Sequence, residues 1–224
     1  EWNKVSQINL VACGTSYYAC LTATYWFQKY TGISCNAELA SEFRYKKLIV
    51  DENKLTVFIS QSGETADSLA ALRYVKLKKM QVLSIVNAQE SSMARESDHY
   101  ITIAAGPEIG VASTKALTAQ LSILACLTII IAREKKLLDK ITEKELTTSL
   151  IELPSKITEI LNDDSDIKNI AEKIVNSKSA IFLGRGSCFP IAMEGALKLK
   201  EISYIHAEGY ASGEMKHGPI ALID

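Results

Sequence analysis

The 224-residue sequence lacks an excess of charge of either sign. It carries 25 Lys and Arg against 26 Asp and Glu, which gives a formal net charge of −1. Proteins that bind nucleic acids or anionic membranes through bulk charge usually have a basic excess. We therefore expect no nucleic acid and no membrane as a partner, and an anionic ligand would have to be held by local geometry.

Metal-binding patterns are also missing. The five cysteines form no C-x-x-C pair, and the three histidines are scattered along the chain. Neither set has the spacing of metal ligands, so no metal and no other cofactor is expected. An odd number of thiols is typical of a reducing compartment. Because the chain opens on polar residues and shows no signal peptide, we expect a cytoplasmic protein.

One apolar run requires a membrane test. Residues 116–132 read ALTAQLSILACLTIIIA. A membrane-spanning helix needs about 20 predominantly apolar residues. This run is shorter and contains Gln120 and Ser122, so it predicts a buried helix or a subunit-interface helix instead.

Short apolar runs and helical patterns alternate along most of the chain. The runs cover residues 8–13, 55–60, 82–86 and 100–104, and helical patterns follow at 17–30 and 66–78. Continuous apolar runs are typical of strands buried on both faces. The order predicts an α/β protein with three layers, a parallel sheet between helices. Residues 115–166 read as helical, with Pro154 expected where one helix ends and the next begins.

A similar unit starts again late in the chain. An apolar run at 180–183 precedes Gly186-Ser187, and a helical pattern follows at 191–204. We interpret this as a duplicated α/β domain, the first copy at 1–150 and the second at 151–224. The second copy has no counterpart of the LTVFIS-QSGET stretch, so we expect it to be incomplete and the sequence to be part of a longer protein.

The stretch SQSGET follows a predicted strand and opens a predicted helix. Helix N-termini carry unpaired N–H groups and partial positive charge, and a glycine allows the backbone to approach a ligand closely. Hydroxyl and amide side chains add neutral donors. The stretch therefore favours phosphate binding by Ser60, Gln61, Ser62 and Thr65 over simple helix capping, which would explain only one hydroxyl.

Two further turns belong to the same predicted edge of the sheet. Thr15 and Ser16 follow the first strand, where the carboxyl ends of parallel strands place ligand sites. Val111 and Ser113 precede the long apolar helix. From the residues alone, capping and ligand binding are equally good interpretations of both turns. A catalytic role for the Cys13 thiol is not favoured, because no base is evident beside it.

The stretch EGALKLKE places charged residues on one helix face. Glu194, Lys198 and Glu201 recur at i, i+4 and i+7. A solvated ion-pair stripe would have the same pattern. Because the helix follows a glycine-rich turn, its charged face could instead perform acid–base chemistry. His217, in a polar turn before Gly-Pro, is a further candidate, better supported by its neighbours than His206.

In this order, the motifs CGTS, SQSGET, VASTK, GRG, EGALKLKEISYIHAE and GEMKHGP resemble the isomerase half of the glucosamine-6-phosphate synthases. These enzymes are also known as the glutamine–fructose-6-phosphate aminotransferases (isomerising). That half is built from two SIS (sugar isomerase) domains. The resemblance runs from Ile8 to Asp224.

The resemblance implies a reaction and a set of roles. The family makes glucosamine 6-phosphate from fructose 6-phosphate and glutamine-derived ammonia. By motif, the phosphate would be held by Ser60, Gln61, Ser62 and Thr65, with Thr15 and Ser16 at the same pocket and Val111 and Ser113 against the sugar. Glu201 matches the base that moves a proton between C1 and C2, and Lys198 a lysine beside the sugar hydroxyls. His217 matches the ring-opening histidine that reaches a neighbouring subunit, which implies a homodimer.

Two parts of the family pattern have no counterpart in these 224 residues. They are the N-terminal glutaminase domain with its terminal cysteine and the C-terminal tail with its Schiff-base lysine. We therefore expect this chain to bind fructose 6-phosphate or glucosamine 6-phosphate without completing the synthase reaction. The alternatives are another SIS phosphosugar isomerase or deglycase, and a non-catalytic regulator that senses a sugar phosphate.

Overall fold

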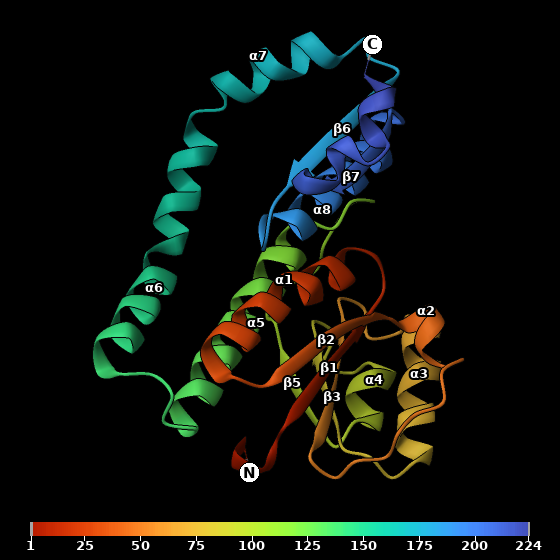
Figure 1. Cartoon of the computed structure of the whole chain (residues 1–224), viewed down its shortest axis with the longest axis vertical. Coiled ribbons are helices and arrows are strands. Elements are labelled where there is room, and N and C mark those ends of the chain that lie inside the picture. Colours follow the sequence, from red (N-terminus) through yellow and green to blue (C-terminus); the bar gives the residue numbers. More distant parts are fainter. Residues whose placement is uncertain (1, 224) are drawn as a thin grey trace.

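The computed structural model describes residues 2–223, in which strands and helices alternate as predicted (Figure 1). The strands are β1 (Gln7–Ala12), β2 (Ser34–Leu39), β3 (Lys54–Ser60), β4 (Val82–Val86), β5 (His99–Thr102), β6 (Ser179–Gly184) and β7 (His206–Ala211). The α-helices are α1 (Gly14–Thr31), α2 (Ala40–Phe43), α3 (Ala66–Leu77), α4 (Ser92–Glu96), α5 (Lys115–Glu134), α6 (Lys140–Asn162), α7 (Ser165–Ile174) and α8 (Cys188–Ser203). The 3-10 helices are η1 (Trp2–Lys4), η2 (Ser212–Lys216) and η3 (Pro219–Leu222).

The main sheet has the strand order β2-β1-β3-β4-β5, and its neighbours pair in parallel. The strands β1, β3 and β4 are buried almost throughout, as their continuous apolar sequences predict. Parallel pairing brings the carboxyl ends of these strands to one edge. The turns after β1 and β3 therefore lie side by side.

The core lies on both faces of this sheet. On one face Leu10, Phe27 and Leu124 belong to a buried cluster between the sheet, α1 and α5. On the other face Val11 and Phe58 belong to a second buried cluster with α2, α3 and α4. Successive β1 residues enter opposite clusters because side chains alternate across a strand. The three-layer α/β prediction is confirmed.

The apolar helix α5 is long and apolar enough to cross a membrane by length and composition, and 44% of its most apolar window is buried. It lies along α1 (Figure 1) and contributes Leu124, Leu127 and Ile131 to the core. The run therefore forms a helix whose core residues contact the sheet and α1, and its alternative role at a subunit interface stays a prediction.

A second, smaller unit comprises β6, α8 and β7. The two strands pair in parallel, and α8 packs on both of them. Its order matches that of β1, α1 and β2, as the predicted duplication requires. Helix α8 also packs on α1, which joins the two units (Figure 1).

The sequence analysis did not predict the strands β2 and β7. Each of them is the second strand of one strand–helix–strand unit. Both carry polar residues at alternate positions, SCNAEL and HAEGYA, so neither is a continuous apolar run. The strand β2 lies at the edge of the main sheet, where one row of side chains need not be buried. Their polar content follows from that partial exposure.

The expectation for Pro154 was wrong. Pro154 lies inside α6, and the helical region is interrupted instead between α5 and α6 and between α6 and α7. Asp139 caps α6 by accepting hydrogen bonds from the N–H groups of Ile141 and Thr142 at 2.8 and 2.9 Å. Proline removes one helical hydrogen bond. Since α6 contains no buried residue, water can reach the carbonyl that Pro154 leaves without a partner.

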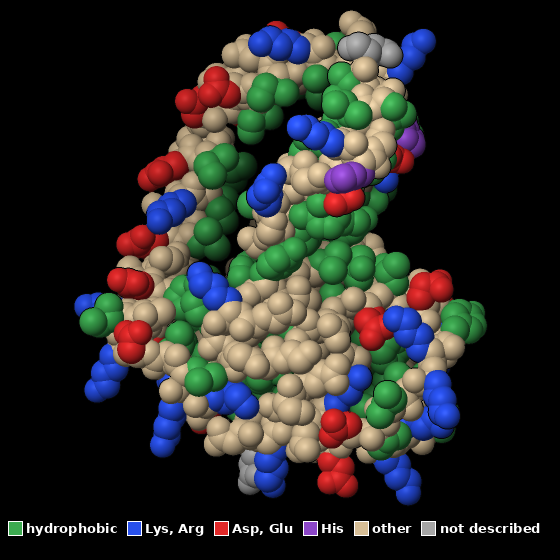
Figure 2. All heavy atoms as spheres, in the orientation of Figure 1, with side chains coloured by type: hydrophobic (Ala, Val, Ile, Leu, Met, Phe, Trp, Pro, Cys, Tyr) green, Lys and Arg blue, Asp and Glu red, His purple; other side chains and the backbone are tan. Residues whose placement is uncertain are grey.

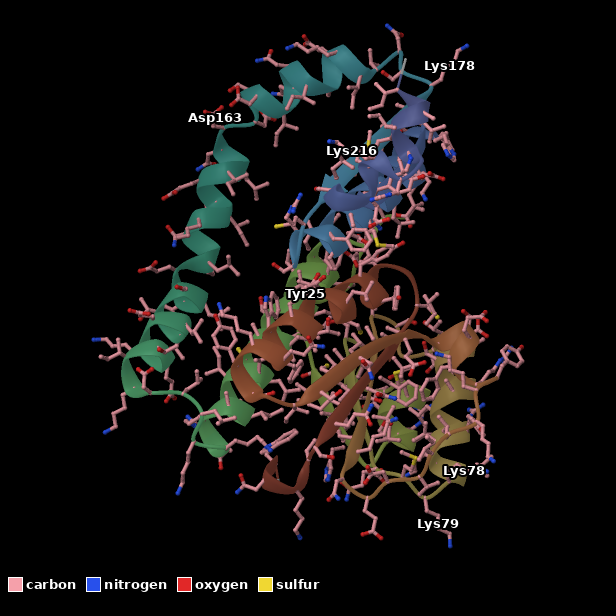
Figure 3. All side chains as sticks on the ribbon, viewed as in Figure 1. Tyr25, Lys78, Lys79, Asp163, Lys178 and Lys216 are labelled. Atoms are coloured by element: carbon pink, nitrogen blue, oxygen red, sulfur yellow. The ribbon has the colours of Figure 1, made fainter. Side chains whose placement is uncertain are left out.

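Helices α6 and α7 form an arm that connects α5 to β6 (Figure 1), and Asp163 marks the bend between them (Figure 3). Apolar side chains lie on the side of the arm facing the β6–α8–β7 unit, and charged side chains lie on the outer side (Figure 2). The large apolar residues exposed on the arm include Ile151, Ile160, Leu161, Ile167 and Ile170. The predicted boundary between residues 150 and 151 falls inside α6 and stays a prediction.

Candidate active site

A cavity of about 220 Å³ opens at the carboxyl edge of the main sheet. Its walls come from the turns after β1 and β3, the loop before α5, and α8. The lining residues are Cys13, Thr15, Ser16, Ile59, Ser60, Gln61, Ser62, Thr65, Val111, Ser113, Lys198 and Glu201. The structure thus brings together every predicted site residue except His217.

The turn after β3 is shaped by its own hydroxyl groups. Ser60 Oγ accepts a hydrogen bond from Gly63 N at 3.0 Å and lies 3.2 Å from Thr65 Oγ1. Gly63 has φ +66°, and a Cβ at this position would lie 2.2 Å from Ser91 Oγ. Glycine is therefore required for the tight path of this loop.

Helix capping, the alternative to phosphate binding at this turn, is not found at Thr65. Thr65 precedes the first turn of α3, but its side chain makes no cap hydrogen bond. Within residues 2–223, Ser62 Oγ accepts only from Glu64 N, at 3.2 Å, and its hydroxyl hydrogen has no acceptor there. The side chains of Ser60, Ser62 and Thr65 line one cavity directly before α3, and a hydroxyl-rich lining next to a helix N-terminus suits an anion.

The turn after β1 also places hydroxyl-bearing side chains at the cavity. Cys13 precedes α1 and makes no side-chain cap. Its Sγ lies 3.8 Å from Ser68 Oγ, and no basic group among its hydrogen-bond partners would activate it. The next residues, Thr15 and Ser16, both line the cavity, and Ser16 Oγ accepts a hydrogen bond from Gln120 Nε2 at 2.9 Å.

The loop before α5 is held by Glu108. Its carboxylate accepts hydrogen bonds from Thr114 N at 2.7 Å and from Ser113 Oγ at 3.0 Å. Burial raises the pKa of Glu108, but these hydrogen bonds outweigh burial and leave the pKa below its usual value. The ionised carboxylate therefore fixes Ser113, which lines the cavity together with Val111 of the same loop.

The charged face predicted for residues 194–201 is present on α8. Lys198 Nζ lies 3.5 Å from Glu194 Oε1 and 2.5 Å from Glu201 Oε2. The same ammonium donates a hydrogen bond to Thr15 Oγ1 at 3.0 Å, and Thr15 Oγ1 donates to Glu194 Oε1 at 3.1 Å. This network connects the second unit to the turn after β1.

Glu194 is 4% exposed and lies behind this network. Burial raises the pKa of Glu194, and Glu201 raises it further, while Lys198 and the Thr15 hydroxyl offset part of the rise. Glu194 stands in the predicted charged face, but the sequence did not show that it would be buried beneath Lys198. Its contact with Thr15 makes it a support for the cavity wall.

Gln120 and Glu108 are the other supporting residues that sequence reasoning missed. Gln120 lies inside the apolar run of α5, where its polar side chain was the only signal. Glu108 lies five residues before Ser113, in a loop without a strong pattern. Each makes a hydrogen bond to a residue that lines the cavity, Gln120 to Ser16 and Glu108 to Ser113.

His217 lies apart from the cavity. It follows η2, is exposed, and belongs to the second unit, where its neighbour Lys216 is labelled in Figure 3. The predicted role of His217 in a neighbouring subunit stays a prediction. Within residues 2–223, no group of three or more His, Cys, Asp or Glu side chains is arranged to hold a metal ion.

The lining divides into two chemical regions. Neutral hydroxyl and amide groups come from the turns after β1 and β3, and Lys198 with Glu201 comes from α8. The two regions meet at Thr15, whose hydroxyl accepts from Lys198 and donates to Glu194. The first region can donate hydrogen bonds to a phosphate, and the second can exchange protons with a neighbouring atom. A phosphorylated molecule with an acidic C–H or O–H group would use both.

Comparisons with known proteins identify what this arrangement resembles. The family model described as SIS domain matches residues 2–130 and 173–224. A glutamine–fructose-6-phosphate aminotransferase (isomerizing) of Haemophilus ducreyi is 54% identical over 222 residues, 99% of this chain and 36% of the relative. The chain spans about 37% of the length of the first curated relatives that it matches.

Solved structures of related enzymes also match this chain. The C-terminal domain of the glucosamine-fructose-6-phosphate aminotransferase from Francisella tularensis matches with a TM-score of 0.95 and 50% identity, over 100% of this chain and 63% of that chain. A glucosamine-6-phosphate deaminase from Thermotoga maritima matches with a TM-score of 0.74 and 25% identity, over 98% of this chain and 65% of that chain.

Proposed function

The chain belongs to the SIS domain family, and we propose that it is the sugar-phosphate-binding, isomerase part of an enzyme that makes glucosamine 6-phosphate from fructose 6-phosphate. The observation that supports this most directly is the shared cavity. Hydroxyl-rich turns and the Lys198–Glu201 pair line one space of about 220 Å³, although they come from distant parts of the sequence.

The first region of the cavity would bind the phosphate. Ser60, Gln61, Ser62 and Thr65 surround the start of α3, and Thr15 and Ser16 flank it from α1. Neutral donors and a helix N-terminus stabilise a phosphate dianion without a dedicated Arg or Lys. The ketose would then extend past Val111 and Ser113 toward α8.

The second region would perform the proton transfer. Glu201 would take a proton from C1 and return it at C2 through an enediol-like intermediate, since one base on one face suffices for this transfer. Lys198, 2.5 Å from Glu201 Oε2, would donate a hydrogen bond to the developing negative charge on oxygen. Both groups belong to α8, so their spacing is fixed by one helix.

The supply of ammonia and the opening of the sugar ring would need a further domain and a second copy of the chain. We propose that ammonia comes from a glutaminase domain, since the relatives are named for glutamine and this chain matches 37% of their length. A second copy of the chain would bring His217 to the site for ring opening, which requires a homodimer. We also propose a cytoplasmic location, which the five free thiols support.

Glu201→Gln in the full-length enzyme tests this function. Turnover should fall by a factor of at least about 100, the contribution of one positioned acid–base group. Fructose 6-phosphate binding should survive, because the phosphate contacts lie elsewhere. Glu159→Gln, on the exposed arm helix α6, serves as a control and should change neither. Unchanged turnover in Glu201→Gln would instead favour a regulator that only senses the sugar phosphate.

A deaminase acting on glucosamine 6-phosphate is the second candidate, supported by the Thermotoga maritima structure. That match has 25% identity, against 50% for the aminotransferase domain. Release of ammonia from glucosamine 6-phosphate by the full-length protein, without any synthesis from glutamine, would favour the deaminase.

A further inference from the structure

Gln120 is a buried polar residue that lies directly behind the cavity. It belongs to α5, is 1% exposed, and its Nε2 donates a hydrogen bond to Ser16 Oγ at 2.9 Å. Its Oε1 is buried as well and has no hydrogen-bond partner in the part of the chain that the structure describes. A buried amide with one unpaired atom is costly compared with an apolar side chain of the same length. Folding alone therefore does not account for glutamine at this position.

Ser16 is the third residue of α1, so, unlike the other buried hydroxyl residues of α1 and α5, it has no carbonyl of its own helix four residues earlier. Thr22, Thr31 and Thr128 each donate their hydroxyl hydrogen to the backbone carbonyl four residues earlier, at 3.0, 2.6 and 2.8 Å. This bond is the usual one for a hydroxyl inside a helix. Among the hydrogen bonds of residues 2–223, Ser16 Oγ only accepts, from Gln120. Its hydrogen has no acceptor among these described residues.

The direction of the Ser16 hydroxyl hydrogen follows from the hydrogen bond that Gln120 Nε2 donates to Ser16 Oγ. A serine hydroxyl has one hydrogen, and it cannot point at Nε2, which already donates to the same oxygen. Ser16 lines the cavity, so the hydrogen is free to point into it. If the Gln120 amide were reversed, the Ser16 hydroxyl would donate its hydrogen to Oε1. It could then no longer donate a hydrogen bond into the cavity.

We propose that Gln120 is a positioning residue for the phosphate site, which keeps the Ser16 hydroxyl as a donor toward a phosphate oxygen. The inference rests on the proposed function, because it takes the ligand of this cavity to be a sugar phosphate. It goes further by assigning a residue outside the cavity to the recognition of the anion.

Gln120→Met tests the proposal, since methionine keeps the length and apolar stem of the side chain but removes the donor. The Kd for fructose 6-phosphate, measured by calorimetry on this chain, should rise about fivefold to tenfold. The thermal unfolding midpoint should be equal to or above that of the unmodified chain. Thr128→Val, a buried polar-to-apolar change on the same helix, should leave the Kd within about twofold.

A double-mutant cycle separates positioning from a general structural role. If Gln120 acts through Ser16, then Ser16→Ala combined with Gln120→Met should bind no more weakly than Ser16→Ala alone. A further fivefold loss in the double variant would overturn the proposal. Equal Kd values for Gln120→Met and the unmodified chain would also overturn it. Should Gln120→Met fail to fold, Gln120→Leu provides the same measurements.

Titration of the unmodified chain with fructose 6-phosphate separates failure of the proposed function from failure of the inference about Gln120. No binding of fructose 6-phosphate by that chain would remove the proposed function together with this inference. Binding by the unmodified chain with no effect of Gln120→Met or Gln120→Leu would remove the inference alone.

Discussion

Lys198 Nζ lies 3.0 Å from Thr15 Oγ1, although 183 residues separate them in the sequence. Thr15 begins α1 in the first unit, and Lys198 lies on α8 in the second. The packing of α1 on α8 brings them together. The hydroxyl-rich turns after β1 and β3 and the Lys198–Glu201 pair therefore line one cavity only because the two units pack on each other.

Ser62→Ala should weaken binding of fructose 6-phosphate. Ser62 lines the cavity, and its hydroxyl hydrogen is free for a ligand. Loss of one charge-assisted hydrogen bond costs about 1.5–3 kcal/mol, which raises the Kd by roughly 10-fold to 150-fold. Calorimetry on the purified variant measures this. Ser149→Ala, an exposed position on α6, is the control, and an unaltered Kd in Ser62→Ala would remove Ser62 from the site.

Glu194→Gln should change how stability depends on pH. The folded-state pKa of Glu194 is raised above its ordinary value of 4.5 by burial. A raised pKa contributes stability below pH 4.5, and this contribution is lost as the pH rises through the folded-state value. The unfolding free energy of the unmodified chain minus that of Glu194→Gln should therefore decrease with rising pH. Urea unfolding between pH 4 and 8 measures it, and a constant difference would contradict the burial of an ionisable carboxyl.

Lys198→Met should destabilise the fold. It removes the cation from Glu194, which would remain buried without an opposite charge. Breaking a buried pair costs about 3 kcal/mol, the low end of the usual range, because 18% of the Lys198 side chain is exposed. Adding Glu194→Gln should restore part of the loss.

Lys156→Met provides the matched control for that experiment. Lys156 pairs with Glu152 on α6, but both side chains are more than half exposed. Such pairs contribute about 0–1 kcal/mol. Equal losses of unfolding free energy in the two lysine variants would show that Lys198 is not a partner of a buried charge.

Gly63→Ala should damage the phosphate turn. The residue has φ +66°, and the new Cβ would collide with the Ser91 side chain. A non-glycine residue in this backbone region costs about 1–3 kcal/mol before the collision is counted. We expect both a lower unfolding free energy and weaker ligand binding, measured by urea unfolding and calorimetry. Gly213→Ala has open space around it and should behave as the unmodified chain does.

Local patterns predicted the turns of the site well. The hydroxyl groups of SQSGET follow a strand of continuous apolar residues, and parallel pairing fixes the edge at which they lie. The spacing of Glu194, Lys198 and Glu201 fixes one helix face. Both predictions depend only on residues near one another in the sequence, for which periodicity is sufficient.

Features that depend on distant packing were not predictable. The contact of Lys198 with Thr15 requires the orientation of α8 on α1, which no local pattern contains. Gln120 could be recognised as a support only once α5 was placed behind Ser16. Pro154 was misplaced because its local preference to end a helix was outweighed in an exposed helix that continues past it.

The central claim is that this cavity recognises a sugar through its phosphate, and paired calorimetric titrations of the unmodified chain test it most directly. Fructose 6-phosphate should bind saturably at one site per chain, and fructose at the same concentrations should give no binding heat. Equal binding of the two sugars, or binding of neither, would contradict the claim.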